Sequence, residues 1–486
     1  MRIKYISGAL GLVMIYFGPL LVVPALFSAI LNEYYSILPF LLSACISFLF
    51  GYGFYKYSGH RKDFNDLKKK EALFIVTAAW LLLSMITSIP YLFYSLSPID
   101  ALFEAVSGLS TCGATIISDY SLFPKSFFFW RSMSQWVGGL GVIVMFVAIL
   151  PQFAVAGRQM FFAETSGFQS DKFIPRVKDI TTRLLSIYLF LTFFAALAFY
   201  LVGMSFFDSV CTAFSTVSAG GLSPNQSSIM GYKNIWINTA VTVFMFLAGI
   251  NFVLQYKVIF EGKLKPVFKN SEFRYYCMII LFASVVLALI LYFYNHYSSL
   301  GHCFLDSLFH VISVITSTGF ASVDFNLWNT QAKAILFMLM FVGASAGSAG
   351  GGIKIIRFIY IVKYLKREVV NILHPRAIIP IKLDNIIVSK DVGRQILGFV
   401  FFYFLIFIII SLIVSIIENN AILGILGTAS TLGNIGVVFE IIGPMSSFKE
   451  LTIATKMLFM FTMLIGRLEL IPIIAMLQLD FWRIKK

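Results

Sequence analysis

The sequence predicts an all-α protein that crosses a membrane many times. Hydrophobic residues make up 59% of its 486 residues and charged residues 12%, whereas soluble globular chains have about 45–50% and about 25%. The mean hydropathy is +0.87, so most of the chain needs lipid rather than water around it. The apolar runs are continuous, which excludes a transmembrane β-barrel, because barrel strands alternate over about ten residues.

Ten segments are expected to cross the bilayer, because each approaches the roughly 20 apolar residues that a spanning helix requires. Nine are continuous, and the tenth, 333–365, is interrupted by small residues. The continuous segments lie near 6–31, 35–55, 72–94, 128–151, 183–203, 235–259, 275–295, 395–417 and 452–480. Four shorter apolar segments are interpreted as re-entrant half-helices, near 100–112, 208–220, 306–318 and 420–435.

The distribution of Lys and Arg predicts the orientation. Lys354 and Arg467 are set aside as intramembrane candidates. All but six of the others fall in connections on the side of the N-terminus, and the six are Lys125, Arg131, Lys233, Lys333, Lys449 and Lys456. Because basic residues accumulate in cytoplasmic connections, both termini are expected to be cytoplasmic and the half-helices to enter from outside. This pattern accounts for the net charge of +14 without nucleic-acid binding.

The half-helices belong to an internal repeat. Three of them place an Asp thirteen positions before a Gly, namely Asp100 before Gly113, Asp208 before Gly221 and Asp306 before Gly319; the fourth ends at Gly436 and lacks the Asp. Each Asp is interpreted as a cap at the start of its half-helix, in preference to the alternative of a direct ligand for the ion. The predicted unit is helix, half-helix, loop and helix. It occurs at 71–157, 158–262, 263–366 and 367–486, after a two-helix preface at 1–70.

Four such units can surround a single central pore. Irregular backbone at membrane depth is tolerated only where it is buried in protein or lines a water-filled cavity. A half-helix that enters from outside directs the negative end of its dipole towards the membrane centre, which favours a cation there. Glycine lets the backbone that follows turn its carbonyl groups to the axis, where they can replace the water around an ion.

These segments resemble the TrkH/KtrB/HKT superfamily of potassium transporters, and its TrkH branch most closely. The similar pieces are STCGAT at 110–115, TVSAGGLS at 216–223, TSTGFAS at 316–322, LGNIGVV at 432–438, GASAGSAGGGIK at 343–354 and IGRLELIP at 465–472. The resemblance covers essentially the whole chain.

The resemblance implies a filter that binds potassium, with one glycine from each repeat. These glycines would be Gly113, Gly221, Gly319 and Gly436. Gly220 competes with Gly221, and the thirteen-residue spacing favours Gly221. The flanking filter residues would be Thr111 and Cys112, Ala219 and Gly220, Ser317 and Thr318, and Asn434 and Ile435. Glycine in all four repeats is the arrangement expected of a potassium-permeable member.

The segment 343–352, GASAGSAGGG, has no side chain larger than Ser. It matches GxxxxG, but Ile353 stands where a phosphate-binding loop requires Lys, so nucleotide binding is not expected. The segment is interpreted either as a flexible kink in the helix or, as the resemblance implies, as an intramembrane gating loop. The gate residues would be Gly343, Ser345, Gly347, Ser348, Gly350, Gly351 and Gly352. With so few side chains, this loop is expected to pack weakly.

Arg467 lies within an apolar helix, where a charge must face the protein interior or a water-filled cavity. We interpret it as a positive barrier in a cation pathway; the alternative is a structural partner for Glu469 or for backbone carbonyls. Lys354 is a weaker gate candidate, because its side chain can extend to the cytoplasm.

The resemblance implies potassium uptake across a bacterial plasma (inner) membrane, without a covalent cofactor. It also implies a homodimer and a cytosolic nucleotide-binding ring of the TrkA type, which could contact the basic segment 357–394. Two other classes compete. An ion-coupled secondary transporter (K⁺ or Na⁺ symport) should carry acidic residues on spanning helices, where Glu469 is nearly alone. A membrane-embedded enzyme should carry clustered His or acidic residues, and the sequence has no such cluster, so no enzymatic activity is expected.

Overall fold

The computed structural model describes residues 2–59, 68–149, 173–294, 299–377, 379–384, 386–437, 439, 443, 446–468 and 476. Within these residues the regular secondary structure is almost entirely helical. The sheet that they contain is a small antiparallel hairpin of β1 (Lys382–Leu383) and β2 (Ile386–Ile387). The expected all-α membrane fold is therefore confirmed.

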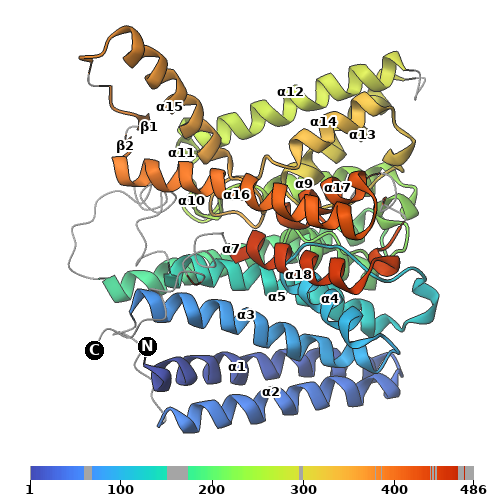
Figure 1. Ribbon diagram of the computed structural model, residues 1–486. Helices are drawn as coiled ribbons and strands as arrows, with labels where there is room; N and C mark the ends of the chain where they lie inside the picture. The colour runs from blue at the N-terminus through green and yellow to red at the C-terminus, as the bar shows by residue number, and fades with distance from the viewer. Residues whose placement is uncertain are drawn as a thin grey trace.

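The preface is a pair of helices, α1 (Ile3–Ile30) and α2 (Ile37–Tyr57), at one edge of the molecule (Figure 1). Their backbones approach closely at two glycines. A Cβ atom on Gly51 would lie 2.9 Å from the carbonyl oxygen of Gly11. The hydroxyl of Ser47 donates a hydrogen bond of 2.7 Å to the carbonyl of Met14 across the same contact. Small residues thus allow the close helix contact that is common in membrane proteins.

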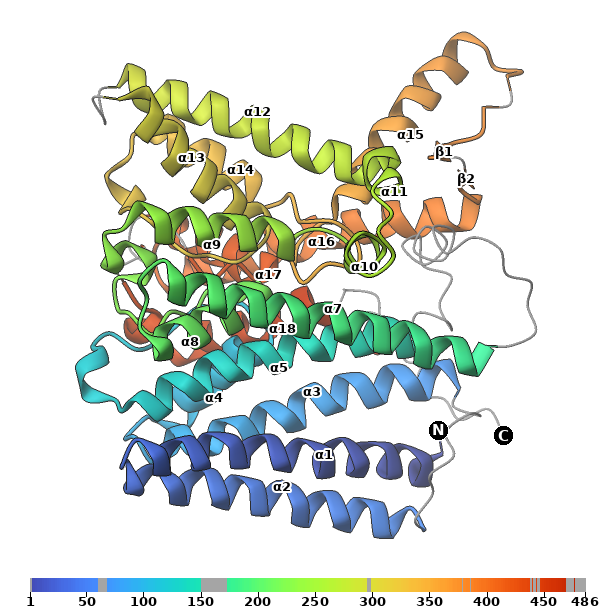
Figure 2. The same cartoon turned by 180° about the vertical axis from the view of Figure 1, so that it is seen from behind.

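The same order of elements then occurs four times, each time with a half-helix between two other helices. Successive layers of these helices are visible from behind, where α3, α5, α7 and α9 follow the preface across the molecule (Figure 2). The first repeat contains α3 (Lys69–Leu92), half-helix α4 (Pro98–Leu109) and α5 (Lys125–Ile149). The second contains α7 (Phe173–Leu201), half-helix α8 (Phe206–Val217), α9 (Ile235–Ala248) and α10 (Phe252–Ile259).

After the short α11 (Lys265–Lys269), the third repeat contains α12 (Ser271–Phe293), half-helix α13 (Leu300–Ile315), α14 (Thr330–Leu339) and α15 (Ile355–Leu373). The fourth contains α16 (Lys390–Ile417), half-helix α17 (Ala421–Gly433) and α18 (Ile453–Leu468). The boundary predicted after residue 366 falls inside α15. The division into four repeats at the predicted boundaries stays a prediction.

The count of ten crossings stays a prediction, because the expected segments 128–151 and 452–480 extend beyond the described residues. Among the described residues, six helices are by themselves long and apolar enough to span a membrane. The segment expected to cross at 235–259 is instead broken into α9 and α10, which meet at an angle of 107°; counting this pair as one span gives seven. The break follows Ala248 at Gly249, Ile250 and Asn251, and the Asn251 side chain caps the start of α10.

The aspartates of the repeat do not cap their half-helices, so that interpretation is wrong. Ser97 and Ser205 are the caps of α4 and α8, and their hydroxyls accept the backbone N–H of Asp100 and Asp208, respectively. Asp306 lies within α13, which begins six residues earlier. An acidic residue in the first turn still stabilises a helix through its interaction with the helix dipole. This explains why the Asp–Gly spacing correctly located the starts of α4 and α8.

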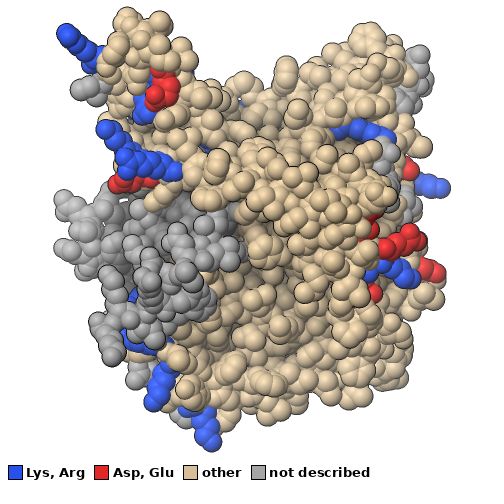
Figure 3. Space-filling view, viewed as in Figure 1, with Lys and Arg blue, Asp and Glu red and all other residues tan. Residues whose placement is uncertain are grey.

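The surface has the polarity of a membrane protein. A broad band without Lys, Arg, Asp or Glu runs across the middle of the molecule, and charged side chains gather at its two ends (Figure 3). The start of α1, the end of α2 and the β1–β2 hairpin lie at the same end (Figures 1 and 2). This placement agrees with the shared side predicted for these basic segments; the assignment of that side to the cytoplasm stays a prediction.

We expect Gly51→Leu to destabilise the protein, because the new side chain would collide with the backbone of α1 at Gly11 and Ile15. Overpacking of this kind typically costs about 1–3 kcal/mol. Gly53→Leu is the matched control, since a Cβ on Gly53 meets no atom within 4 Å. Thermal denaturation in detergent, followed by size-exclusion chromatography, should give a lower midpoint for Gly51→Leu alone. Equal midpoints for the two variants would contradict the close contact of α1 and α2.

Candidate functional site

All four half-helices end in the same backbone turn. The residue that ends each turn is left-handed, with φ between 53° and 56°, although none is glycine; these residues are Thr111, Ala219, Ser317 and Asn434. The next residue donates its N–H to the carbonyl of a serine five positions earlier, at 2.8–3.0 Å; these serines are Ser107, Ser215, Ser313 and Ser430. This bond is typical of the Schellman motif that ends many helices. The four repeats therefore share a backbone conformation as well as a sequence pattern.

One glycine follows each turn and completes a ring. These glycines are also left-handed, with φ between 76° and 84°; they are Gly113, Gly221, Gly319 and Gly436. A Cβ atom on any of them would lie only 1.8–2.2 Å from a carbonyl oxygen of the next repeat. Those carbonyls belong, in the same order, to Gly220, Thr318, Ile435 and Cys112. The contacts close on themselves, because the fourth repeat meets the first.

This ring distinguishes between the two candidate glycines of the second repeat. Gly221 has the positive φ and the close contact that Gly113, Gly319 and Gly436 have. Gly220 instead supplies the carbonyl that faces Gly113. The geometry thus places Gly221 in the position equivalent to the other three glycines. The twelve predicted filter residues all lie in these four turns and the glycines that follow them.

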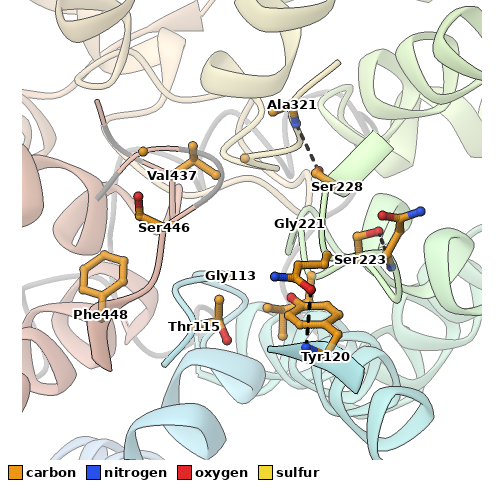
Figure 4. Close-up of a pocket in the computed structure, with 16 residues that line it drawn as sticks. Gly113, Thr115, Tyr120, Gly221, Ser223, Ser228, Ala321, Val437, Ser446 and Phe448 are labelled. Atoms are coloured by element: carbon orange, nitrogen blue, oxygen red, sulfur yellow. Dashed lines mark hydrogen bonds between the residues drawn. The ribbon is translucent and has the colours of Figure 1, made fainter. Parts of the chain in front are cut away.

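A small hollow opens on one side of the ring. Its volume is about 60 Å³, and all four glycines line it. The lining also includes residues that follow the glycines, among them Thr115, Ser223, Ala321 and Val437 (Figure 4). The side chains that line it carry no charge. A cation in this hollow would therefore meet backbone dipoles and hydroxyl groups.

A buried ion pair supports the first repeat. Glu104 of α4 and Arg131 of α5 have exposed fractions of 0% and 1%, and Arg131 Nε lies 2.6 Å from Glu104 Oε1. Arg131 also donates to the hydroxyl of Thr115 at 2.9 Å, and Glu104 accepts the N–H of Ile116 at 3.1 Å. The pair therefore holds the backbone of the loop that follows Gly113. Arg131 was expected in an external connection; it is buried instead, because Glu104 neutralises its charge.

A glutamine joins the first repeat to the second. Gln135 of α5 donates from Nε2 to the carbonyl of Gly220 at 2.6 Å, and its Oε1 accepts the N–H of Leu222 at 3.1 Å. It thereby holds the backbone on both sides of Gly221. In the fourth repeat, Asn434 donates to the carbonyl of Ser110 at 3.3 Å. Side-chain amides thus connect neighbouring repeats beside the ring.

The segment 343–352 lies on the opposite side of the ring from the hollow. The N–H of Gly351 donates to the hydroxyl of Ser317 at 2.6 Å. A Cβ on Gly351 would lie 2.6 Å from the carbonyl oxygen of Gly433, and one on Gly350 would lie 2.8 Å from that of Thr316. These partners precede the glycines of the ring, whereas the hollow is lined by residues that follow them. The predicted gate segment therefore lies under the ends of α13 and α17.

The segment is firmly packed, contrary to the expectation of weak packing. Its N–H groups at Ser345 and Ala349 donate to the carbonyls of Gly249 and Ala248 at the end of α9. Its carbonyl at Gly347 accepts the N–H of Phe252 at the start of α10 at 3.1 Å. Helix ends leave such backbone groups without hydrogen-bond partners inside the helix. At the break between α9 and α10, the segment supplies these partners, and the helix ends in turn supply partners for the segment. Small residues here permit close backbone contact.

Two buried cations bind the segment's carbonyls. Arg467 of α18 is 4% exposed and donates from Nη1 to the carbonyl of Ala349 at 2.8 Å. This contact agrees with the backbone-carbonyl alternative; Glu469 lies outside the described residues. Lys354 donates to the carbonyl of Gly350 and is buried. The sequence suggested that the Lys354 side chain extends to the cytoplasm; it is buried in the protein instead.

Sequence reasoning missed Glu104, Gln135 and Glu272. Glu272, in the first turn of α12, accepts the N–H of Ala346 at 2.7 Å. A polar or charged residue inside an expected apolar segment indicates a buried partner or a functional role. Glu104 and Gln135 both lie in such segments and could have been identified in this way. Glu272 lies just before the segment expected at 275–295, so position alone suggested a solvent-exposed helix start.

Comparison with known proteins gives a consistent result. Residues 41–481 match the TrkH family, described as cation transport proteins. The Trk system potassium uptake protein TrkH of Escherichia coli K12 is 32% identical over 87% of this chain and 88% of its own length. The TrkH of Halomonas elongata is 30% identical over 99% of this chain and 100% of its own length.

A solved structure agrees with these sequences. The crystal structure of the potassium transporter TrkH from Vibrio parahaemolyticus superposes with a TM-score of 0.90 at 30% identity. The match covers 99% of this chain and 100% of that one. The chain belongs to the TrkH family of cation transport proteins.

Proposed function

We propose that this protein takes up potassium ions across the bacterial inner membrane through a pore on the axis of its four repeats. The observation that carries the proposal is the ring of four left-handed glycines, each against a carbonyl of the next repeat. Backbone carbonyls can replace the hydration shell of K⁺. The names of the relatives, which are potassium uptake proteins, support K⁺ as the transported ion.

The filter consists of the twelve residues of the four turns and their glycines, and K⁺ binds there to backbone oxygens. It contains one ring of glycines, which gives fewer carbonyl layers than a long potassium-channel filter has, so its preference for K⁺ over Na⁺ should be modest. The gate consists of the segment 343–352 together with Arg467. Three observations support this role: the segment's place beneath the ring, its lack of large side chains and the buried charge beside it.

We further infer a homodimer with both termini in the cytoplasm. A cytosolic nucleotide-binding ring of the TrkA type would bind the basic segment 357–394, which includes most of α15 and the hairpin. The relatives belong to a Trk system, which supports a partner subunit. Any nucleotide would therefore act through that partner and not through this chain.

The alternative is an ion-coupled transporter, which should carry acidic residues within the membrane region. Glu104 and Glu272 are buried carboxylates of this kind. Both, however, are hydrogen-bonded to the protein, Glu104 to Arg131 and Glu272 to Ala346. We expect K⁺ uptake into liposomes that contain the purified protein to continue when a protonophore collapses the proton gradient. Loss of uptake under the protonophore would instead support proton coupling.

Gly113→Ser should lower the K⁺/Na⁺ permeability ratio severalfold. A Cβ on Gly113 would lie 2.2 Å from the carbonyl oxygen of Gly220, and the φ of 84° at Gly113 is unfavourable for Ser. The carbonyl must therefore move, and with it the ion coordination. Gly301→Ser, in the first turn of α13 and away from the ring, is the control. Electrical recording of both variants in bilayers tests the filter, and an unchanged ratio in Gly113→Ser would count against it.

Arg467→Ala should raise K⁺ uptake, because the substitution removes a positive charge from a low-dielectric cation path. The loss of its bond to Ala349 should also release the segment. A barrier lowered by about 1.4 kcal/mol corresponds to roughly tenfold faster uptake. Arg467→Lys keeps the charge and should stay close to the unmodified protein. If Arg467→Lys conducts as freely as Arg467→Ala, the hypothesis that the positive charge alone forms the barrier is wrong.

A further inference from the structure

The segment 343–352, here called the gating loop, is held at its centre by a carboxylate. Glu272 is 6% exposed, and its Oε1 accepts the N–H of Ala346 at 2.7 Å. Hydrogen bonds to a charged acceptor are stronger than those between neutral groups. The neighbours of Ala346, which are Ser345 and Gly347, bond to the broken helix α9–α10. Glu272 therefore acts at the point where the loop is already fixed on both sides.

The loop is bound by groups of complementary charge. Arg467 and Lys354 donate to its carbonyls at Ala349 and Gly350, whereas Glu272 accepts from an N–H. The three charged groups come from α18, from the residue before α15 and from α12. Moving the loop would take the Ala346 N–H away from a buried carboxylate, which is unfavourable where water cannot take its place.

The first turn of α12 is also bonded to the β1–β2 hairpin. The carboxylate of Asp384, in the turn of the hairpin, accepts the N–H of Ser271 at 3.0 Å. Ser271 directly precedes Glu272, so one helical turn contacts the hairpin through one residue and the gating loop through the next. The hairpin lies at the end of the molecule where α1 begins (Figure 1), and it is thus placed to receive a signal from outside the membrane region.

We propose that Glu272 is a latch that holds the gating loop closed, and that Asp384 connects this latch to the β1–β2 hairpin. The proposal rests on the gating role proposed above for the loop. A displacement of the hairpin would shift the first turn of α12 and draw the carboxylate away from Ala346. The pore would then open without any change in the ring of glycines, so gating would change and ion preference would not.

The test compares Glu272→Ala with Glu272→Asp in liposomes that contain the full-length protein, with ⁸⁶Rb⁺ uptake as the measurement. Loss of a hydrogen bond to a charged group should shift the equilibrium towards the open loop about tenfold. Asp keeps a negative charge at the start of α12, which stabilises the helix, but it is one methylene shorter, so we expect it to lose the hydrogen bond to Ala346. Both variants should therefore raise uptake, with an unchanged Rb⁺/Na⁺ ratio.

A purely structural role for Glu272 gives a different result. If Glu272 only stabilises α12, Asp should behave as the unmodified protein does, and the latch would be overturned. Glu261→Ala is the matched control, since Glu261 is a nearby carboxylate whose ion pairs are with Lys263 and Arg183. It should leave uptake unchanged, and a rise equal to that of Glu272→Ala would also overturn the latch.

Two further variants separate the latch from its premises. Arg467→Ala tests the gate itself: if it raises uptake and Glu272→Ala does not, the latch is wrong and the gate stands. If neither raises uptake, the gating role of the loop is wrong as well. Asp384→Ala should raise uptake less than Glu272→Ala, because it loosens the helix turn without removing the carboxylate. Unchanged uptake in Asp384→Ala would overturn the connection to the hairpin.

Discussion

The structure depends on a ring of backbone contacts that leaves no space for side chains. Each of Gly113, Gly221, Gly319 and Gly436 lies so close to a carbonyl of the next repeat that a Cβ atom would overlap the oxygen. The left-handed φ of these residues also favours glycine. Because the ring closes, a displacement in one repeat is passed to its neighbours. The surrounding helices and side chains therefore have to hold four turns in one common geometry.

The four repeats meet this demand with different side chains. Nine positions before each ring glycine stand Glu104, Thr212, His310 and Gly427. Glu104 forms the buried ion pair with Arg131, whereas His310 bonds to the carbonyl of Asp306 and lies among the rings of Phe309, Phe325 and Trp328. The backbone is thus fourfold in conformation while its support is not. Removing one partner of a buried ion pair leaves an uncompensated buried charge and destabilises the protein. The support of the first repeat is therefore sensitive to substitution of either Glu104 or Arg131.

The gating loop and the broken helix α9–α10 solve one problem together. A helix break in a membrane leaves carbonyl and N–H groups that water cannot reach. Here the loop of the third repeat supplies the partners for Ala248, Gly249 and Phe252 of the second. The position of the loop is therefore stabilised by backbone hydrogen bonds as well as by charged side chains.

The sequence by itself determined the membrane fold, the four half-helices and the positions of the ring glycines. These features follow from local properties, because the length of an apolar segment, its small residues and its glycines can all be identified from neighbouring residues in the sequence. The thirteen-residue spacing even chose Gly221 over Gly220, and the geometry agrees. The family resemblance added the loop and Arg467, which the structure places side by side.

Only the tertiary structure decided which groups meet. Arg131 is buried because Glu104 lies beside it, and Lys354 is buried because the carbonyl of Gly350 accepts its hydrogen bond. Neither partnership is visible in the sequence, since a charged residue near an apolar segment looks the same whether it faces water or a buried partner. Likewise, the bend after Ala248 and the firm packing of the loop depend on each other. Hydropathy measures the residues of one segment, whereas the free energy of a buried charge or a broken helix is set by the atoms that surround it.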